Sequence, residues 1–320
     1  MKNFRIFSVT TGLIVALSLT GATAYAAKCL YIDSYHQGYA WSDGIVKGLL
    51  PELENKCEVQ QFHMDTKNNT SEEFKKEAAL QAKAIIESFG PDVVIVSDDN
   101  AVKYLVQPHY KDNALPFVFC GVNWSADSYG LPYKNVTGMV EVSTITAQIN
   151  VAKKVVPNMK KVFYLDADNL TAQKTVKYYQ ELFEEKGYEF SSNLVDTFEE
   201  WKKTFLEAQQ YDVVIVANNS GIKSWNNEEA ATFALENSKK FSMTEYDWMM
   251  PYTLVGLTKV PEEQGMWAGK TAVNILQGKD PAKINIVTNQ KSNIFVNKSL
   301  QNKLNIDLPS SIVKNATIIE

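Results

Sequence analysis

Short, almost wholly apolar runs alternate with amphipathic helical stretches along most of this sequence, and the whole pattern occurs twice. Residues 92–97 read DVVIVS and residues 212–217 read DVVIVA, so one run closely echoes the other. Strands covered by helices on both faces lack a polar alternation, so such runs predict parallel sheets. No Gly- or Ser-rich linker separates the two sets. We therefore expect an α/β chain of two lobes, each a mostly parallel sheet flanked by helices.

The lobe boundaries follow from where the pattern restarts. We expect the chain to cross between lobes near residues 138–142, 254–258 and 282–286, and these segments would form a hinge. The N-terminal lobe is then residues 27–141 plus 256–282, and the C-terminal lobe is residues 142–255 plus 283–320. Right-handed crossovers place the carboxyl ends of the strands on one side of each sheet, where ligands of such sheets bind. A ligand site is therefore expected in a cleft between the lobes.

The first 26 residues have the layout of an export signal. Lys2 and Arg5 precede an apolar stretch at residues 12–19, and Ala24-Tyr25-Ala26 is an A-x-A cleavage signal. The apolar stretch is too short to span a bilayer as a permanent helix. We expect cleavage before Ala27 and a soluble, exported protein.

The charge of the mature chain argues against a nucleic-acid partner. Lys2 and Arg5 are the charged residues of the signal, so its removal changes the net charge from −5 to −7. Binding to phosphate backbones requires clustered positive charge. We therefore expect no nucleic-acid partner.

Three cysteines remain in the expected mature chain. Cys29 and Cys57 each begin an apolar run. If those two strands are parallel neighbours, their sulfurs start at the same edge, and an exported protein can keep a disulfide. We expect a bond between them, with two buried thiols as the alternative. Cys120 is then a free thiol.

Aromatic residues gather in the loop that follows the first predicted strand. Residues 34–41 include Tyr35, His36, Tyr39 and Trp41. Such rings suit stacking on a planar or cationic ligand. The alternative for Trp41 is packing of the next helix against the sheet.

Acidic, amide and further aromatic residues follow the other strands or lie in the expected crossings. These candidates are Asp98, Asp99, Asn100, Asn123, Trp124, Glu141, Asp168, Asn169, Asn219, Ser220, Tyr246, Asp247 and Trp248. We expect Asp98 or Asp99 to hold a ligand amine, with Asp168 or Asp247 doing so from the other lobe, while the amides and Ser220 bind its polar groups. Any single loop could serve only as a turn, and Asp99 or Asn100 could instead cap a helix. Their joint placement at strand ends favours a ligand site. Because they include almost no Arg or Lys, a zwitterion or amine fits better than a phosphate.

Motifs of common enzyme classes are missing from the sequence. There is no G-x-S-x-G elbow, no P-loop and no G-x-G-x-x-G, and the three histidines are His36, His63 and His109. We therefore expect no catalytic activity, no cofactor and no metal.

Taken in order, several of these segments resemble a known family. The chain is similar to the ABC-type solute-binding proteins of the tryptophan/tyrosine-binding-like group, which have the type I periplasmic-binding fold. The segments that carry the resemblance are SYHQGYAW (34–41), PFVFCGVN (116–123), VTG (136–138), YDWMM (246–250), EQG (263–265) and ILQGK (275–279). The resemblance covers essentially the whole mature chain.

The resemblance implies a periplasmic, monomeric protein that closes two lobes on a small ligand. An amino acid or related amine would then pass to the membrane permease of an ABC importer. The segments at 34–41 and 116–123 are most similar to a version fused to bacterial sensor kinases and cyclic-dinucleotide enzymes. The alternative is therefore a ligand-sensing subunit that docks on a membrane sensor protein. A structural or adhesive exported domain is a third class, which the clustered loops disfavour.

Overall fold

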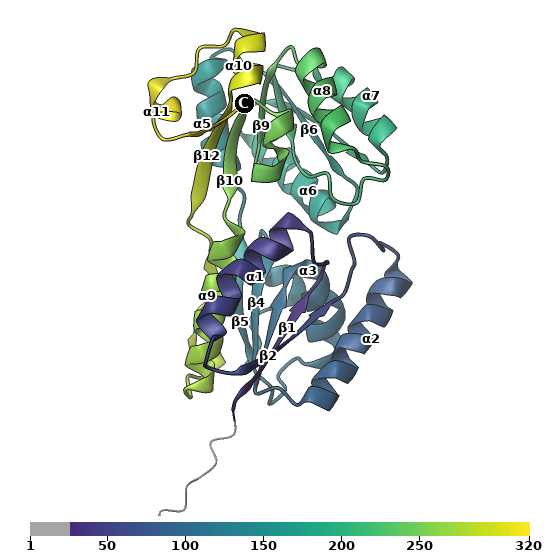
Figure 1. The fold of residues 1–320 in the computed structure, drawn as a ribbon, viewed down its shortest axis with the longest axis vertical. Helices are drawn as coiled ribbons and strands as arrows, with labels where there is room; N and C mark the ends of the chain where they lie inside the picture. The colour runs from purple at the N-terminus through teal and green to yellow at the C-terminus, as the bar shows by residue number, and fades with distance from the viewer. Residues whose placement is uncertain (1–25) are drawn as a thin grey trace, which may run out of the picture.

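The computed structural model describes residues 26–320, which form two α/β lobes stacked end to end (Figure 1). The signal peptide expected at residues 1–26 lies outside the described residues, apart from Ala26. Helices flank the sheet of each lobe. The two-lobed, mostly parallel α/β architecture expected from the repeated pattern is confirmed.

Lobe 1 is built on a six-stranded sheet in which all neighbouring strands are parallel. In spatial order its strands are β11 (Val287–Thr288), β5 (Val136–Glu141), β4 (Phe117–Asn123), β3 (Val93–Ser97), β1 (Lys28–Asp33) and β2 (Glu58–His63). Strands β3 and β4 are buried along their whole length. Their side chains alternate between two apolar clusters, so the sheet is covered on both faces.

The α-helices of lobe 1 include one that comes from far along the chain. They are α1 (Ala40–Leu53), α2 (Glu72–Phe89), α3 (Asp98–Ala101), α4 (Gln107–His109) and α9 (Pro261–Leu276). Helix α9 packs closely on α1, because a Cβ on Gly265 would lie 1.9 Å from the carbonyl oxygen of Ile45. Glycine at this position lets the two backbones touch and holds α9 on lobe 1.

Lobe 2 is built on a seven-stranded sheet in which β12 runs antiparallel to β10 and all other neighbouring pairs are parallel. In spatial order its strands are β13 (Thr317–Ile319), β12 (Ser292–Asn297), β10 (Val255–Lys259), β9 (Phe241–Thr244), β8 (Val213–Val216), β6 (Lys161–Ala167) and β7 (Glu189–Val195). Its α-helices are α5 (Ile145–Val155), α6 (Leu170–Glu185), α7 (Phe198–Ala208), α8 (Asn227–Asn237), α10 (Lys298–Leu304) and α11 (Ser310–Val313).

The chain passes between the lobes three times, after β5, after β10 and after β11. The first crossing lies where the sequence predicts it. The other two lie a few residues later than expected. Strand β10 pairs with β9, so residues 256–259 belong to lobe 2, and β11 pairs with β5, so residues 283–288 belong to lobe 1.

Cys29 and Cys57 form a disulfide bond with a Cα–Cα distance of 5.8 Å. Strands β1 and β2 are parallel neighbours in register, with Cys29 opposite Val59. The two sulfurs therefore meet at the edge where both strands begin. Cys120, in β4, is buried and unbonded.

Candidate functional site

The loop after β1 is anchored by the buried carboxylate of Asp33. Its Oδ1 accepts hydrogen bonds from Tyr35 N (3.0 Å), Ser42 Oγ (3.0 Å) and Ser97 Oγ (3.1 Å). Its Oδ2 lies 2.9 Å from His63 Nδ1. Because this one carboxylate ties together β1, β2, β3 and α1, it holds the loop firmly over the carboxyl ends of the strands.

Two adjoining chambers lie between the lobes at these strand ends. We call the one whose lining residues are more completely buried the inner chamber; its empty space, counted together with the solvent space at its mouth, is about 220 Å³. Its lining comes from both lobes and consists of Tyr35, Tyr39, Trp41, Lys67, Asp98, Asn123, Glu141, Thr171, Asn218 and Tyr246. All but Lys67, Thr171 and Asn218 are candidates named from the sequence.

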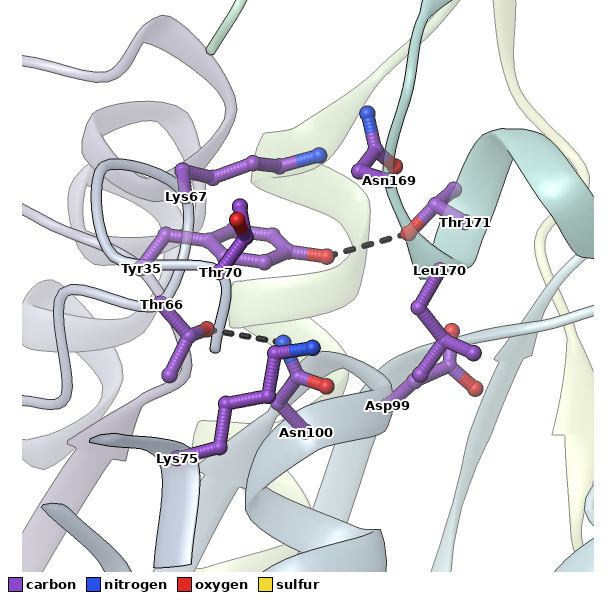
Figure 2. A pocket seen from close by; sticks show the side chains of 10 residues that line it. All are labelled: Tyr35, Thr66, Lys67, Thr70, Lys75, Asp99, Asn100, Asn169, Leu170 and Thr171. Carbon is purple, nitrogen blue, oxygen red and sulfur yellow. Dashed lines mark hydrogen bonds between the residues drawn. The ribbon is translucent and has the colours of Figure 1, made fainter. Parts of the chain in front are cut away.

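The second, outer chamber contains about 310 Å³ of empty space, including its mouth (Figure 2). It is lined by Tyr35, Thr66, Lys67, Thr70, Lys75, Asp99, Asn100, Asn169, Leu170 and Thr171. The chambers share Tyr35, Lys67 and Thr171. Between them, the hydroxyl of Tyr35 in lobe 1 lies 3.2 Å from Oγ1 of Thr171 in lobe 2. This contact is one of several that hold the lobes together.

Asp98 lines the inner chamber and has one carboxylate oxygen without a partner among the described residues. Its Oδ1 accepts a hydrogen bond of 3.0 Å from Trp41 Nε1, whereas its Oδ2 is buried and has no partner among the described residues. Burial, followed by the charges of Asp33 and Glu141, raises the pKa of Asp98 well above its usual range. A cation placed beside Oδ2 would therefore stabilise the ionised form.

Asp98 also has an unusual backbone. Its φ of 67° lies in the left-handed region, which is sparsely populated by residues other than glycine. The neighbouring Gly121 leaves room for its side chain, since a Cβ there would lie 2.9 Å from Asp98 Oδ1. Strain of this kind is found most often at functional sites.

Asp99, the next residue, has no oxygen left over for a ligand. Its Oδ1 accepts hydrogen bonds from Tyr129 Oη (2.7 Å) and from Lys174 Nζ (2.8 Å), and its Oδ2 accepts one from Asn123 Nδ2 (2.8 Å). Lys174 belongs to α6 of lobe 2, so this ion pair spans the cleft. Of the two carboxylates expected at this strand end, Asp98 is the one available for a ligand amine.

A buried charge cluster lies where the crossing strands meet. Lys259, at the end of β10, bonds to Glu141 at the end of β5 and lies 3.5 Å from Glu245. Burial disfavours the charge on Lys259, but the two carboxylates outweigh it and raise its pKa well above the usual range. The carboxylate of Glu141 is therefore already neutralised by the protein itself.

The expectation that the site contains almost no cations is wrong. Lys67, Lys174 and Lys259 all reach the cleft. They were missed because none lies in the strand-end loops that the sequence analysis singled out: Lys67 lies in the loop after β2, Lys174 within α6 and Lys259 at the end of a crossing strand.

Seven of the sequence candidates line neither chamber, and three of them are Trp124, Asp168 and Asp247. Trp124 donates from Nε1 to Thr175 Oγ1 (3.3 Å) and stacks on Tyr178 across the lobe boundary. Asp168 is exposed and accepts a hydrogen bond of 2.8 Å from Gln173 Nε2. Asp247 is also exposed, and its Oδ1 accepts a hydrogen bond from the next backbone N–H. An amine-binding role for Asp168 or Asp247 therefore has no geometric support.

Four other candidates lie on a separate open groove at the side of the cleft. They are His36, Asn219, Ser220 and Trp248. Asn218, one residue before this pair of polar residues, is the one that reaches the inner chamber. Its Nδ2 donates a hydrogen bond of 2.6 Å to Tyr39 Oη. The sequence indicated the correct loop, but not which of its residues points inward.

Asn169 lies at the boundary between the outer chamber and a helix. It lines the outer chamber, and its Oδ1 accepts a hydrogen bond from Ala172 N at the start of α6.

Within residues 26–320 no cluster of His, Cys, Asp or Glu has the composition of a metal site. No helix in that part of the chain is long and apolar enough to cross a membrane.

The fold and the cleft define the class of protein. Two mostly parallel sheets joined by three crossings, with chambers at the facing strand ends, are the architecture of type I periplasmic binding proteins. An ABC-domain protein from Streptococcus pneumonia solved with L-Trp has a TM-score of 0.72 and 18% identity, covering 92% of this chain and 100% of that one. A conserved domain protein from Vibrio cholerae O1 biovar eltor has a TM-score of 0.74 and 17% identity over the same shares.

A third similar structure is the ligand-free, open form of CD0873, a substrate binding protein with adhesive properties from Clostridium difficile. It has a TM-score of 0.67 and 16% identity, covering 92% of this chain and 99% of that one. At these identities the structural likeness establishes the fold alone. No curated protein matches the chain by sequence.

The family is established by sequence. A model of the family described as ABC transporter substrate binding protein matches residues 35–319. The chain belongs to this family of binding proteins.

Proposed function

We propose that this protein is an exported solute-binding component that closes its lobes on an amino acid or a related small amine. The observation that carries the ligand class is Asp98, a buried residue that lines a chamber between the lobes and whose Oδ2 has no partner among the described residues. A buried carboxylate favours a cationic partner. A primary amine supplies both the charge and the hydrogen-bond donor.

The rest of the inner chamber suits the body of such a ligand. The rings of Tyr35, Tyr39, Trp41 and Tyr246 line it. Aromatic walls bury apolar ligand surface and attract cations. The Trp-bound structure from Streptococcus pneumonia supports an amino acid as a ligand for this fold.

The partner and the location are part of the same proposal. The family description supports delivery to the membrane permease of an ABC importer. We propose that the protein does this outside the cytoplasm, as a monomer. Ligand uptake in cells that lack the protein tests the importer role. Unchanged uptake, with a lost response of a membrane sensor to the ligand, would favour the sensor-docking alternative instead.

The ligand class is tested with the purified protein. Thermal unfolding is followed with L-tryptophan, L-tyrosine, L-leucine, tryptamine, tyramine and 3-methylbutylamine. A ligand present at a free concentration of about 100 times its Kd should raise the free energy of unfolding by about 2.7 kcal/mol. Asp98→Asn should weaken amine binding at least about tenfold, since a charge-assisted hydrogen bond is lost.

The matched control is Asp127→Asn, an exposed aspartate outside both chambers. It should leave the affinities unchanged. If no amine or amino acid stabilises the wild type, or if Asp98→Asn binds as tightly as the wild type, the proposed ligand class is wrong.

A further inference from the structure

Lys67 is a buried cation that has no bonded anion among the described residues. The residue is 4% exposed, and its ammonium group makes no hydrogen bond or ion pair with any residue in the described part of the chain. Its Nζ lies 4.5 Å from the centre of the Tyr35 ring and 5.5 Å from that of Tyr39. A ring face satisfies such a charge only partly.

The other lysines of the cleft are in a different situation. Lys174 is bonded to Asp99, and Lys259 to Glu141. Burial lowers the pKa of Lys67, although the charges of Asp166 and Asp98 oppose this shift. A buried ammonium without a bonded anion is costly, and the carboxyl groups near Lys67 act on it without forming a hydrogen bond or ion pair.

Lys67 lines the outer chamber, and a second lysine, Lys75, lines the same chamber. Lys75, in the first turn of α2, is 8% exposed. Its Nζ lies 3.3 Å from Glu72 Oε1, a long contact to a half-exposed carboxylate. Figure 2 shows the Lys67 and Lys75 side chains extending toward the space between the lobes, with Thr66 and Thr70 beside them.

The opposite wall of the chamber is the start of α6 in lobe 2. Asn169, Leu170 and Thr171 line the chamber there. The first N–H groups of a helix have no partners within it, and the helix dipole favours an anion at this end. The helix end and Lys67 are independent features, and they point into one space from opposite lobes.

We propose that the outer chamber is a subsite for the carboxylate group of the ligand, held between Lys67 of lobe 1 and the first turn of α6 of lobe 2. This inference rests on the proposed function, because the same ligand places its amine at Asp98 in the adjoining inner chamber. The ligand is then a zwitterion that carries both groups. By bridging the two lobes, its carboxylate favours the closed form.

The charges around the chambers favour a carboxylate over a phosphate. Four carboxyl groups lie near enough to Lys67 for their charges to raise its pKa: Asp98, Asp99, Glu141 and Asp166. A dianion would be repelled by these groups more strongly than a monoanion. A singly charged carboxylate on a ligand that also carries an ammonium group is the better match.

The experiment uses probes that differ only in the carboxylate: L-tryptophan with tryptamine, L-tyrosine with tyramine, and L-leucine with 3-methylbutylamine. Affinities are measured by calorimetry for the wild type, Lys67→Met and Lys67→Gln, with inorganic phosphate as a further probe. Lys76→Met is the matched control, because Lys76 is an exposed lysine of the same helix as Lys75.

We expect the wild type to bind at least one acid about tenfold or more tightly than its amine. Both Lys67 variants should lose this preference because acid affinity falls, whereas amine affinity should not fall, since a positive charge near Asp98 has been removed. The Lys76 variant should keep the preference. This threshold corresponds to one charge-assisted hydrogen bond.

The outcomes separate the two proposals. The carboxylate subsite is wrong, and the proposed function survives, if the wild type binds amines as tightly as the corresponding amino acids. The same conclusion follows if the Lys67 variants still prefer the amino acids, or if they lose affinity for amino acids and amines equally. If phosphate binds the wild type and is lost with Lys67, the assignment to a carboxylate is wrong. If neither acids nor amines bind, the proposed function fails, and the subsite with it.

Discussion

The indole Nε1 of Trp41 donates a hydrogen bond of 3.0 Å to Oδ1 of Asp98. The donor lies at the start of α1 and the acceptor directly follows β3, so the contact joins two elements of lobe 1 at the floor of the inner chamber. It satisfies one carboxylate oxygen and leaves the other without a partner among the described residues.

Trp41→Phe should weaken amine binding about tenfold while changing the melting temperature little. The substitution keeps an aromatic ring but removes the N–H that orients Asp98, and a hydrogen bond to a charged group contributes about 1.5–3 kcal/mol. Calorimetry with tryptamine measures the loss. Trp225→Phe is the control, since its Nε1 bonds to Asn227 outside both chambers. Equal affinities of the Trp41 variant and the wild type would contradict an orienting role.

Amine affinity should rise with pH. Burial raises the pKa of Asp98 in the empty cleft, so the carboxyl group is neutral below that pKa and must release a proton to pair with an ammonium. Below that pKa, the Kd for tryptamine should fall by up to about tenfold per pH unit, and it should level off above it. Calorimetry in buffers of different ionisation enthalpy reports the released proton.

Two variants isolate the source of this pH dependence. Asp98→Asn should abolish it. His63 is bonded to Asp33, and that hydrogen bond raises its pKa, so it is a second titratable group to test. His63→Gln should keep the dependence. If His63→Gln removes it and Asp98→Asn does not, the titrating group has been misassigned.

Lys174→Met should shift the ligand-free protein toward an open form. The ion pair between Lys174 and the buried Asp99 spans the lobes, and its loss leaves a buried carboxylate with one cation fewer. Small-angle scattering should show a larger radius of gyration without ligand. Lys177→Met, an exposed position on α6, should scatter like the wild type. An unchanged radius for Lys174→Met would show that other contacts hold the cleft closed.

Removal of the disulfide should destabilise the protein without altering the site. The bond between Cys29 and Cys57 spans 28 positions. Closing a loop of that size stabilises the folded state by about 3.5 kcal/mol in the chain-entropy model. Urea unfolding of the double variant Cys29→Ser/Cys57→Ser should show this loss. A reducing agent should destabilise the wild type and leave the double variant unaffected; sensitivity of the double variant would contradict the assignment.

Much of the fold could be read from local patterns. A continuous apolar run such as residues 92–97 indicates a strand covered on both faces, because burial on both sides removes the need for polar alternation. The second crossing was placed too early because β10 continues through Thr258 and Lys259, past its apolar residues, and the third because β11 still pairs with β5 of lobe 1. Which sheet a short strand joins depends on its partner, and β11 pairs through only Val287 and Thr288.

The site could be predicted by region but not by residue. The sequence pointed to the loops of Tyr35 and Asp98, because the carboxyl ends of parallel strands lie on one edge. It missed Lys67, since a lysine in a loop is normally solvated, and only burial beside the Tyr35 ring makes it exceptional.

By itself, the sequence determined the two-lobed α/β architecture and the strand ends at which a ligand site would form, because apolar periodicity and strand–helix order are local properties of the chain. Tertiary structure alone decided which charges are available there. Asp98 and Asp99 are neighbours in sequence and identical in chemistry, yet Asp99 is neutralised by a lysine 75 positions away while Asp98 keeps a free oxygen. The physical reason is that charge pairing depends on separation in space, and across this cleft that separation is set by how the two lobes pack.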